Sequence, residues 1–458
     1  MSDTAASTTI KPDSRGARVR AELAERTPKS AAISREAKEV LALEVVPTFE
    51  MPHPIYIESA AGSRVTDIDG NSYIDLTMGF GPHLLGHRPK VIEDAMHEQI
   101  ARGWHVGLHN PLQAELAKLL CEASRCGEQA IFCNSGTEAT MYGMRVARAF
   151  TGKDKVAVFD GNYHGSHDYA LVKAAPESPR EAPLGKILGR GVPEIINDNT
   201  MMVLPYHDEA AYGLIRAHAD ELALVIVQPV QNTVPREDNA DFLHGLLDVC
   251  RECGVLMLMD EVVTGFRIAY GGGQEAYDIT PDLATYGKAL AGGMPIGALV
   301  GRADIMAPLG MGWGNPKGVF SGGTFSGNPL TMAAGIAAVR HMRDHGHEIY
   351  PALKRRSRRM ADAINDYCRE NQIGVQLLSA GSIFYLHFQR EPIETSRDMA
   401  NANRDAEREF YLHLINHGVI VPGIHLFFLS DAHSDEDVDS IIDAFKQSFD
   451  DVRADGFL

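Results

Sequence analysis

The sequence lacks several features that would point to other classes of protein. No apolar run is long enough to span a bilayer, and the polar first 20 residues lack the apolar centre of a signal peptide. Basic residues are outnumbered, since 43 Lys and Arg stand against 61 Asp and Glu and leave a formal net charge of -18. Such a surface repels nucleic acid and anionic membranes. We therefore expect a soluble, cytoplasmic protein with no nucleic-acid or membrane partner.

Cysteine is infrequent as well, with six in 458 residues. Cys250 and Cys253 form a C-x-x-C, which could be half of a zinc site or a redox pair. No second C-x-x-C follows, and the segment has the pattern of the last turn of an amphipathic helix that ends at Gly254. We interpret the two residues as packing thiols and expect no metal site. Scattered thiols fit a reducing compartment.

The central part of the chain alternates between strand and helix patterns. Expected strands cover 130–133, 155–159, 222–227 and 255–259, and expected helices cover 137–150 and 242–253. This alternation predicts an α/β fold with a mostly parallel sheet flanked by helices, and such sheets bind ligands beyond the carboxyl ends of their strands. Because no G-x-G-x-x-G opens a helix after a strand, we exclude a Rossmann-type dinucleotide enzyme.

The patterns divide the chain into four parts. Residues 1–35 are rich in Ser, Thr, Ala and Arg, and we expect a flexible tail there. Residues 86–328 form the large domain, while 36–85 and 329–458 together form a smaller α+β domain. In the last part we expect helices at 330–345, 350–371, 399–416 and 435–452, and a strand at 383–388.

The segment after the strand at 130–133 has the composition of a phosphate cradle. Ser135 and Thr137 offer hydroxyls, and Gly136 lets the backbone approach a ligand closely. The following helix adds free N–H groups and the positive end of its dipole. An ordinary helix N-cap would have the same composition, so this segment is informative only together with others.

Two further segments place charged side chains at strand ends. Asp260 follows the apolar strand at 255–259, where a buried carboxylate needs a cationic partner such as a protonated pyridine nitrogen. A structural salt bridge or a helix cap would also explain a carboxylate at this place. Lys288 lies among small and apolar residues in a segment rich in turn signals. A lysine in such surroundings tends toward a lowered pKa and a nucleophilic amine, although a Gly-rich surface loop could also carry it.

The order of these segments resembles that of the class III (fold type I) aminotransferases that depend on pyridoxal 5'-phosphate (PLP). The matching motifs lie at 134–139, 163–165, 260–267, 287–295 and 323–329, within a resemblance that covers about residues 50 to 455. From Asp260 to Gly301 the sequence is most similar to glutamate-1-semialdehyde 2,1-aminomutase and the β-amino-acid transaminases.

The resemblance implies a role for each motif residue. Lys288 would bind the cofactor as a Schiff base and shuttle the substrate proton, and Asp260 would pair with the pyridine nitrogen. Val262 and Tyr163 would contact the two ring faces. The remaining residues implied are phosphate ligands: Ser135, Gly136, Thr137 and, from the neighbouring subunit of a homodimer, Thr324.

The sequence departs from the family pattern at three places. Gln228 stands where the family usually has Glu, which removes a negative charge near the cofactor. Thr233 occupies about the place of a glutamate that gates a substrate arginine in some aminotransferases. The stretch at 45–54 corresponds to the segment in which the aminomutase has a substrate-binding arginine, and it contains none.

Three functions remain open at this point. The first is transfer of an amino group between an amine or amino acid, including a β-amino acid, and a keto acid or aldehyde. The second is an intramolecular amino shift of the aminomutase type with the same residues. The third is a PLP-fold lyase, a decarboxylase or a protein that binds without transferring nitrogen.

Overall fold

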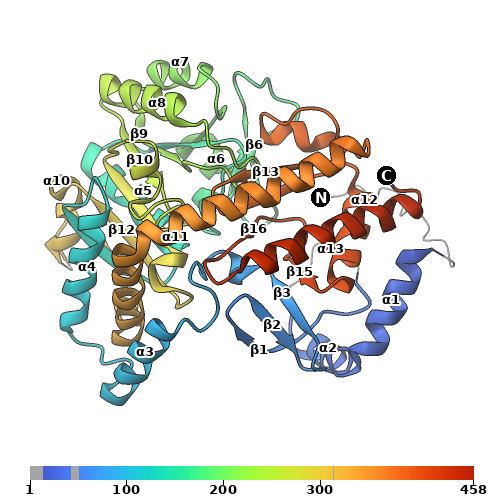
Figure 1. The fold of residues 1–458 in the computed structure, drawn as a ribbon. Coiled ribbons are helices and arrows are strands. Elements are labelled where there is room, and N and C mark those ends of the chain that lie inside the picture. Colours follow the sequence, from blue (N-terminus) through green and yellow to red (C-terminus); the bar gives the residue numbers. More distant parts are fainter. Residues whose placement is uncertain (1–13, 43–50, 313) are drawn as a thin grey trace. The chain divides into compact units, whose positions relative to one another are not determined.

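The computed structural model describes residues 14–42, 51–312 and 314–458. Contacts divide the chain into two compact units, and Figure 1 labels most of the larger elements. Unit 1 comprises Met1–Pro89, Pro351–Ile393 and Asp398–Leu458, and unit 2 comprises Lys90–Tyr350 and Glu394–Arg397. No helix in the described ranges is both long and apolar enough to cross a membrane.

Unit 2 is built on a seven-stranded sheet. In spatial order its strands are β4 (Gln129–Cys133), β12 (Gly297–Gly301), β11 (Leu283–Gly287), β10 (Leu256–Asp260), β9 (Leu222–Val227), β5 (Lys155–Phe159) and β8 (Met201–Leu204). β12 runs antiparallel to both neighbours, and the pairs from β11 to β8 are parallel. The predicted α/β fold with a mostly parallel sheet is confirmed. The antiparallel strand β12 was not among the strands expected from the sequence.

Helices surround this sheet. They are α3 (Lys90–Arg102), α4 (Pro111–Ala123), α5 (Gly136–Thr151), α6 (Glu194–Thr200), α7 (Ala210–Ala217), α8 (Ala240–Cys253), α9 (Gly272–Ala276), α10 (Ala303–Met306) and the first part of α11 (Pro329–Glu370). The chain also forms a hairpin of β6 (Val172–Ala174) and β7 (Gly185–Ile187) and the 3₁₀ turns η2 (Asp168–Ala170), η3 (Lys288–Ala291) and η4 (Ala307–Met311). Val146 of α5 shares a buried core with Leu224 of β9 and Leu258 of β10, so α5 covers one sheet face. Every residue of β9 and β10 is buried, which provides a rigid platform.

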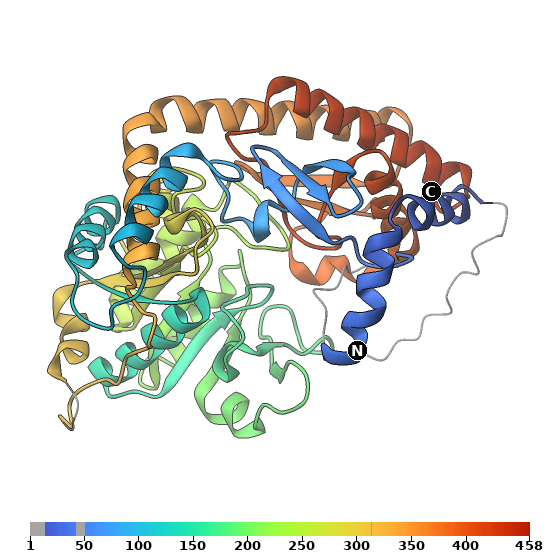
Figure 2. The same ribbon diagram turned by 90° about the horizontal axis from the view of Figure 1, so that it is seen from below.

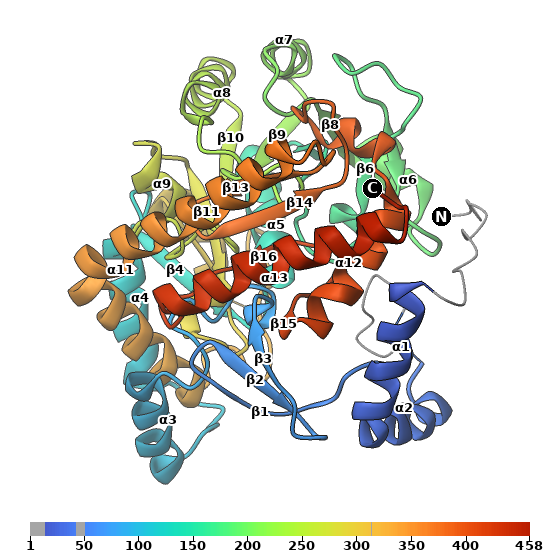
Figure 3. The same ribbon diagram turned by 45° about the vertical axis from the view of Figure 1, so that its right-hand side comes forward.

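The described residues of unit 1 form two small sheets and four α-helices besides the end of α11. One sheet joins β1 (Ile57–Ala61), β2 (Arg64–Asp67), β3 (Ser72–Asp75) and β15 (Val419–Ile420), and the other joins β13 (Gln376–Ala380), β14 (Ile383–His387) and β16 (Phe427–Phe428) (Figure 2). The helices are α1 (Arg15–Arg26), α2 (Pro28–Val40), α12 (Arg404–Asn416) and α13 (Asp435–Ala454), with η1 (Met78–Phe80) between strands and η5 (Ser396–Asn401) before α12. α12 and α13 lie side by side (Figure 3).

The expected flexible tail is wrong for residues 15–35, which form α1 and most of α2. Val19 and Leu23 are buried, and Arg20 makes a bidentate ion pair with Glu409 of α12 at 2.9 and 2.6 Å. Asp455 accepts the backbone N–H groups of Arg15 and Gly16, both at 2.7 Å. The charged residues that suggested disorder are therefore paired with residues about 400 positions away. Residues 1–13 lie outside the described part.

The two helices expected at 330–345 and 350–371 are one helix, α11. Gly346, which lies in the expected gap between the two helices, is part of the continuous helix and packs against Tyr350, whose ring would be 3.0 Å from a Cβ at that position. The division between the units falls after Tyr350, at Pro351, rather than at the expected position of 328/329. The helix expected at 399–416 begins at Arg404, because η5 occupies the preceding residues.

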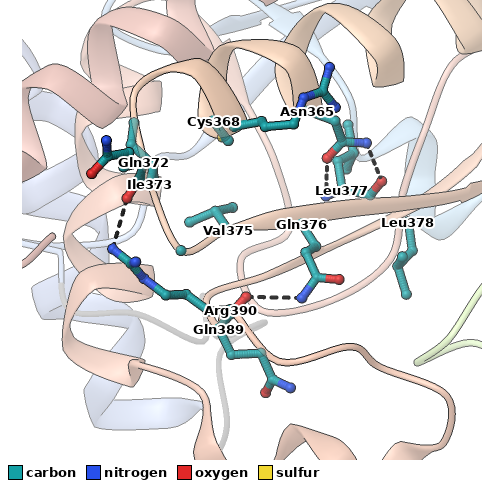
Figure 4. Close-up of a pocket in the computed structure, with 12 residues that line it drawn as sticks. Asn365, Cys368, Gln372, Ile373, Val375, Gln376, Leu377, Leu378, Gln389 and Arg390 are labelled. Carbon is teal, nitrogen blue, oxygen red and sulfur yellow. Dashed lines mark hydrogen bonds between the residues drawn. The ribbon is translucent and has the colours of Figure 1, made fainter.

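Unit 1 also has an open cavity of about 510 Å³ between the end of α11 and β13 (Figure 4). Its lining is polar, and Arg390 donates to the carbonyl of Gln372 at 2.8 Å. None of the predicted site residues lines it.

The C-x-x-C segment lies in α8. Cys250 is buried, which raises the pKa of its thiol. Among the described residues, no group of His, Cys, Asp and Glu is arranged to hold a metal.

Candidate active site

All the predicted site residues lie in unit 2, and all except Thr324, which lies in the loop before α11, are at or just after the ends of its strands. Residues 135–137 begin α5 after β4, Tyr163 follows β5, Asp260 ends β10, and Lys288 follows β11. Parallel strands present their carboxyl ends at one edge of a sheet, so the residues after β5, β9, β10 and β11 share that edge.

Asp260 is held by donors from three directions. It is 3% exposed. One carboxylate oxygen, Oδ1, accepts from the Thr285 hydroxyl at 3.0 Å and from the backbone N–H of Val262 at 3.1 Å. The other, Oδ2, lies 2.6 Å from Nδ1 of His164, which is itself buried. A charged group fixed this tightly at a strand end has one orientation toward a ligand.

Lys288 is placed near this carboxylate by the strand register. Asp260 pairs with Thr285 across β10 and β11, and Lys288 comes three residues later, at the start of η3. Its φ of 44° lies in the left-handed region, which is costly for a residue with a side chain and is maintained only when the surroundings enforce it.

The surroundings of Lys288 change its proton affinity. Burial, and to a smaller extent the buried guanidinium of Arg267, lower the pKa of its ammonium to about 8, and the Asp260 carboxylate opposes this shift. The predicted lowering of this pKa is therefore present in the structure. An amine with a pKa near 8 is available as a nucleophile under mildly basic conditions.

The start of α5 packs tightly against the loop after β10. A Cβ at Gly136 would lie 2.8 Å from Cγ1 of Val262, so a larger residue would collide there. A Cβ at Gly287, directly before Lys288, would lie 3.4 Å from the same methyl group and 3.9 Å from the Gly136 nitrogen. Val262 therefore joins the helix start, the end of β10 and the lysine segment in one place.

The two hydroxyls of this segment have local partners. Ser135 caps α5 by accepting from the N–H of Glu138 at 3.2 Å, and its hydroxyl donates to the Glu138 carboxylate at 3.1 Å. Thr137 Oγ1 accepts from the backbone N–H of Ser166 at 3.3 Å. The ordinary N-cap weighed from the sequence thus exists, and the first N–H groups of α5 have no partner within the helix.

Tyr163 is held through its backbone. Its N–H donates to Oε1 of Gln228 at 3.3 Å, and its carbonyl accepts from Nε2 of Gln228 at 3.0 Å. The side chain is 54% exposed. Partial burial and the nearby Asp260 carboxylate raise the pKa of its phenol. The backbone of Tyr163 is therefore fixed, and its phenol responds to the charge of Asp260.

Thr324 is exposed in the loop before α11. A Cβ at the preceding Gly323 would lie 3.1 Å from the side-chain nitrogen of Asn134, so the loop approaches the start of α5. Tyr142 of α5 fixes the loop further, because its hydroxyl donates to the Gly322 carbonyl at 2.9 Å.

Sequence reasoning had given no role to His164, Thr285 or Arg267. His164 and Arg267 lie inside matching motifs and Thr285 lies two residues before one, but only the structure shows that His164 and Thr285 contact Asp260 and that Arg267 acts on Lys288. Their positions next to motif residues were the one available signal.

The arrangement fits PLP in three respects. Gly136 gives a backbone approach that a Cβ would block, at a helix start suited to phosphate. Asp260 is a buried carboxylate able to pair with a pyridinium. Lys288 has an amine of lowered pKa beside it, able to condense with an aldehyde.

Comparison with known proteins agrees with this geometry. A family model described as Aminotransferase class-III matches residues 46–449. The glutamate-1-semialdehyde 2,1-aminomutase 2 of Brevibacillus brevis is 38% identical over 403 residues, which cover 86% of this chain and 91% of that protein. An omega-transaminase from Sphaerobacter thermophilus has a TM-score of 0.86 at 30% identity and covers 94% of this chain and 99% of its own. A beta-phenylalanine aminotransferase from Variovorax paradoxus has a TM-score of 0.80 at 29% identity, with coverages of 94% and 96%.

Proposed function

The chain belongs to the class III aminotransferase family, as a PLP-dependent enzyme of fold type I, and we propose that it moves an amino group between two substrates. The donor is an amine or amino acid, including β-amino acids, and the acceptor is a keto acid or aldehyde. The observation that carries the proposal is the register of β10 and β11, which brings the carboxylate of Asp260 and the amine of Lys288 to one sheet edge beside the start of α5.

The bound cofactor supplies an aldehyde and an electron-withdrawing ring. Lys288 would hold it through Nζ and would then move a proton to and from the substrate carbon. Asp260 would hold the proton on the ring nitrogen, and Thr285 and His164 keep its carboxylate in one orientation. Val262 and Tyr163 would contact the two faces of the ring.

The phosphate contacts are proposed for the start of α5. The N–H groups of Gly136 and Thr137 bind the phosphate, and Thr137 adds its hydroxyl. The Ser135 hydroxyl is already engaged by Glu138, so its contribution is mainly to fix the cradle.

We also propose that the active unit is a homodimer in which Thr324 reaches the partner's phosphate. Its loop lies beside the segment 103–109, because the rings of His105 and Phe325 are 5.1 Å apart. Large apolar side chains of both segments are exposed, namely Trp104 (62%), Leu108 (78%), Phe320 (58%) and Phe325 (59%). Exposed apolar clusters of this kind mark protein interfaces. The six unpaired cysteines fit a cytoplasmic location.

The intramolecular amino shift is the second candidate, and the names of the curated relatives favour it. The lack of an arginine in the stretch at 45–54 counts against it, although residues 45–50 of that stretch lie outside the described part. A lyase or a non-transferring binder is the third candidate and has no observation in its favour.

Two measurements separate these candidates. The purified enzyme should absorb at about 420 nm, as expected for PLP joined to a lysine; a protein that stays colourless with added PLP would overturn all PLP functions. A panel of amine donors is then tested with and without a keto-acid or aldehyde acceptor. A transferase converts at most one equivalent of donor per active site without an acceptor and turns over repeatedly only when the acceptor is present, whereas a mutase turns over with glutamate-1-semialdehyde alone.

A further inference from the structure

Gln228 makes an unusual contact at the carboxyl end of β9. The residue is 3% exposed, and its single amide group engages both backbone groups of Tyr163, accepting at 3.3 Å and donating at 3.0 Å. A second acceptor, Oδ1 of Asn232, lies 3.5 Å from the same Nε2. Because both neighbouring acceptors face the nitrogen, the amide has only one favourable orientation.

The backbone of Gln228 is itself fixed. It directly follows β9, all of whose residues are buried. The buried hydroxyl of Tyr206 donates to the carbonyl of Gln228 at 3.0 Å, and Asn239 donates to the next carbonyl, that of Pro229, at 2.9 Å. The amide therefore transmits the rigidity of the sheet to the loop that carries Tyr163.

A carboxylate could not replace this amide. An ionised glutamate can accept from the Tyr163 N–H but has no proton to donate to the Tyr163 carbonyl. Its second oxygen would face two other oxygen atoms, the Tyr163 carbonyl and Oδ1 of Asn232, with no hydrogen bond to either. It would also stand near Asp260, because Val227 and Met259 are paired in register and residues 228 and 260 come next at the same edge. Two carboxylates in one buried place oppose each other's ionisation.

We propose that Gln228 is a positioning residue that fixes the backbone of Tyr163, so that its ring stays against the cofactor, while keeping position 228 uncharged beside Asp260. This rests on the role proposed above for Tyr163. The half-exposed ring has no other anchor among the hydrogen bonds of the described residues, so its placement depends on the loop backbone. A loop that is already fixed in its binding conformation loses less entropy when the cofactor binds, so loss of this contact should weaken the affinity for the cofactor.

The test is the PLP dissociation constant of the full-length apoenzyme, titrated by absorbance from pH 5.5 to 9 and expressed as the ratio of variant to wild type at each pH. Gln228→Leu removes both hydrogen bonds, so we expect about tenfold weaker binding at every pH. Gln228→Glu should give a ratio near one at low pH, where a protonated carboxyl can both accept and donate, and a ratio of about ten at high pH, where it is ionised.

The matched control is Gln389→Glu, the same replacement at a buried glutamine of unit 1 that donates to the carbonyl of Glu391. Its ratio should stay near one at every pH, and unfolding of each apoenzyme is followed in parallel. If Gln228→Glu fails to fold, Gln228→Met tests the same lost contacts without a charge.

The outcomes separate this proposal from the one on which it rests. A flat ratio near one for every variant at 228, with weakened binding by Tyr163→Ala, would overturn the role of Gln228 and leave the site intact. Unchanged binding by Tyr163→Ala would instead remove the stacking role and the proposal together. The proposal is supported if the ratio of dissociation constants rises with pH for Gln228→Glu and stays independent of pH for Gln228→Leu and Gln389→Glu. A loss of packing at position 228 would instead be the same at every pH.

Discussion

Both units bury charged side chains, but they use them differently. In unit 1, Arg20 and Glu409 pair with each other, and Nδ1 of the buried His433 lies 2.8 Å from the Ser430 hydroxyl. The ion pair joins α1 to α12, whereas His433, whose pKa is lowered by burial, bonds within the turn before α13. In unit 2, Asp260 and Lys288 stand at the carboxyl ends of adjacent parallel strands. Burial of charge alone therefore does not indicate a reactive site; what distinguishes Asp260 and Lys288 is that they lie at the edge of the sheet where ligands bind.

The same contrast exists between adjacent residues of unit 2. Glu261 is fully buried, and this burial raises the pKa of its carboxyl. It accepts from the Thr264 hydroxyl at 2.5 Å and from the backbone of Gly273 at 2.8 Å, at the start of α9. Glu261 therefore fixes a turn, while its neighbour Asp260 faces the candidate site.

The largest expected effect comes from Lys288→Ala. Because no other group supplies the amine in the proposed reaction, turnover should fall by roughly four or more orders of magnitude. Stability should not fall, since the change removes a buried cation whose desolvation is unfavourable. Steady-state rates and urea unfolding measure the two effects; near-normal turnover would refute the assignment of this lysine.

The next largest effect is expected from Asp260→Asn, and it is compared with Glu261→Gln, the matching change in the adjacent buried carboxylate. We expect Asp260→Asn to bind PLP but to lower kcat by about two to four orders of magnitude, because the ring proton loses its counter-charge. Glu261→Gln should leave kcat within about twofold and lower the free energy of unfolding by about 2 kcal/mol. Equal losses of kcat in both variants would show that the distinction is wrong.

In unit 1 the expected effect is on acid stability. Burial lowers the pKa of His433 from 6.5 to about 4, opposed by Asp437 and Asp75. The folded state thus favours neutral His433, and this stabilisation is complete above pH 6.5 and lost as the pH falls toward 4. The loss amounts to roughly 3 kcal/mol. His433→Asn should flatten the profile of unfolding free energy in this window, and an unchanged acid loss in the variant would contradict the assignment.

Arg20→Ala should give the smallest effect. It leaves Glu409 buried without its partner, which we expect to lower the free energy of unfolding by about 2 kcal/mol, less than for a fully buried pair because Arg20 keeps some exposure. Arg18→Ala, on the exposed side of the same helix, is the control and should change stability by under about 0.5 kcal/mol. Rates per folded enzyme should not change in either variant, since neither residue belongs to the candidate site.

The parts of the fold that depend on local pattern could be predicted from the sequence. The continuous apolar runs of β9 and β10 predict strands that are covered on both faces, and this prediction needs no information from the rest of the chain. The order of α5, Asp260 and Lys288 along the chain was enough to locate the candidate site.

The parts that depend on distant partners could not be predicted. α1 owes its order to Glu409 and Asp455, which no local pattern links to it. The sequence does not indicate which of the adjacent carboxylates, Asp260 or Glu261, faces the site. Their orientations depend on residues farther along the chain, since Thr285 donates to Asp260 and Gly273 donates to Glu261. For the same reason Gln228 appeared only as a departure from the family, without its contact to Tyr163.

Reduction of the holoenzyme with borohydride, followed by peptide mass mapping, tests the central claim most directly. Borohydride fixes the cofactor permanently to the lysine that holds it. The account predicts that the phosphopyridoxyl mass is found on Lys288 and on no other lysine. Attachment to a different lysine, or no attachment in a protein that binds PLP, would contradict it.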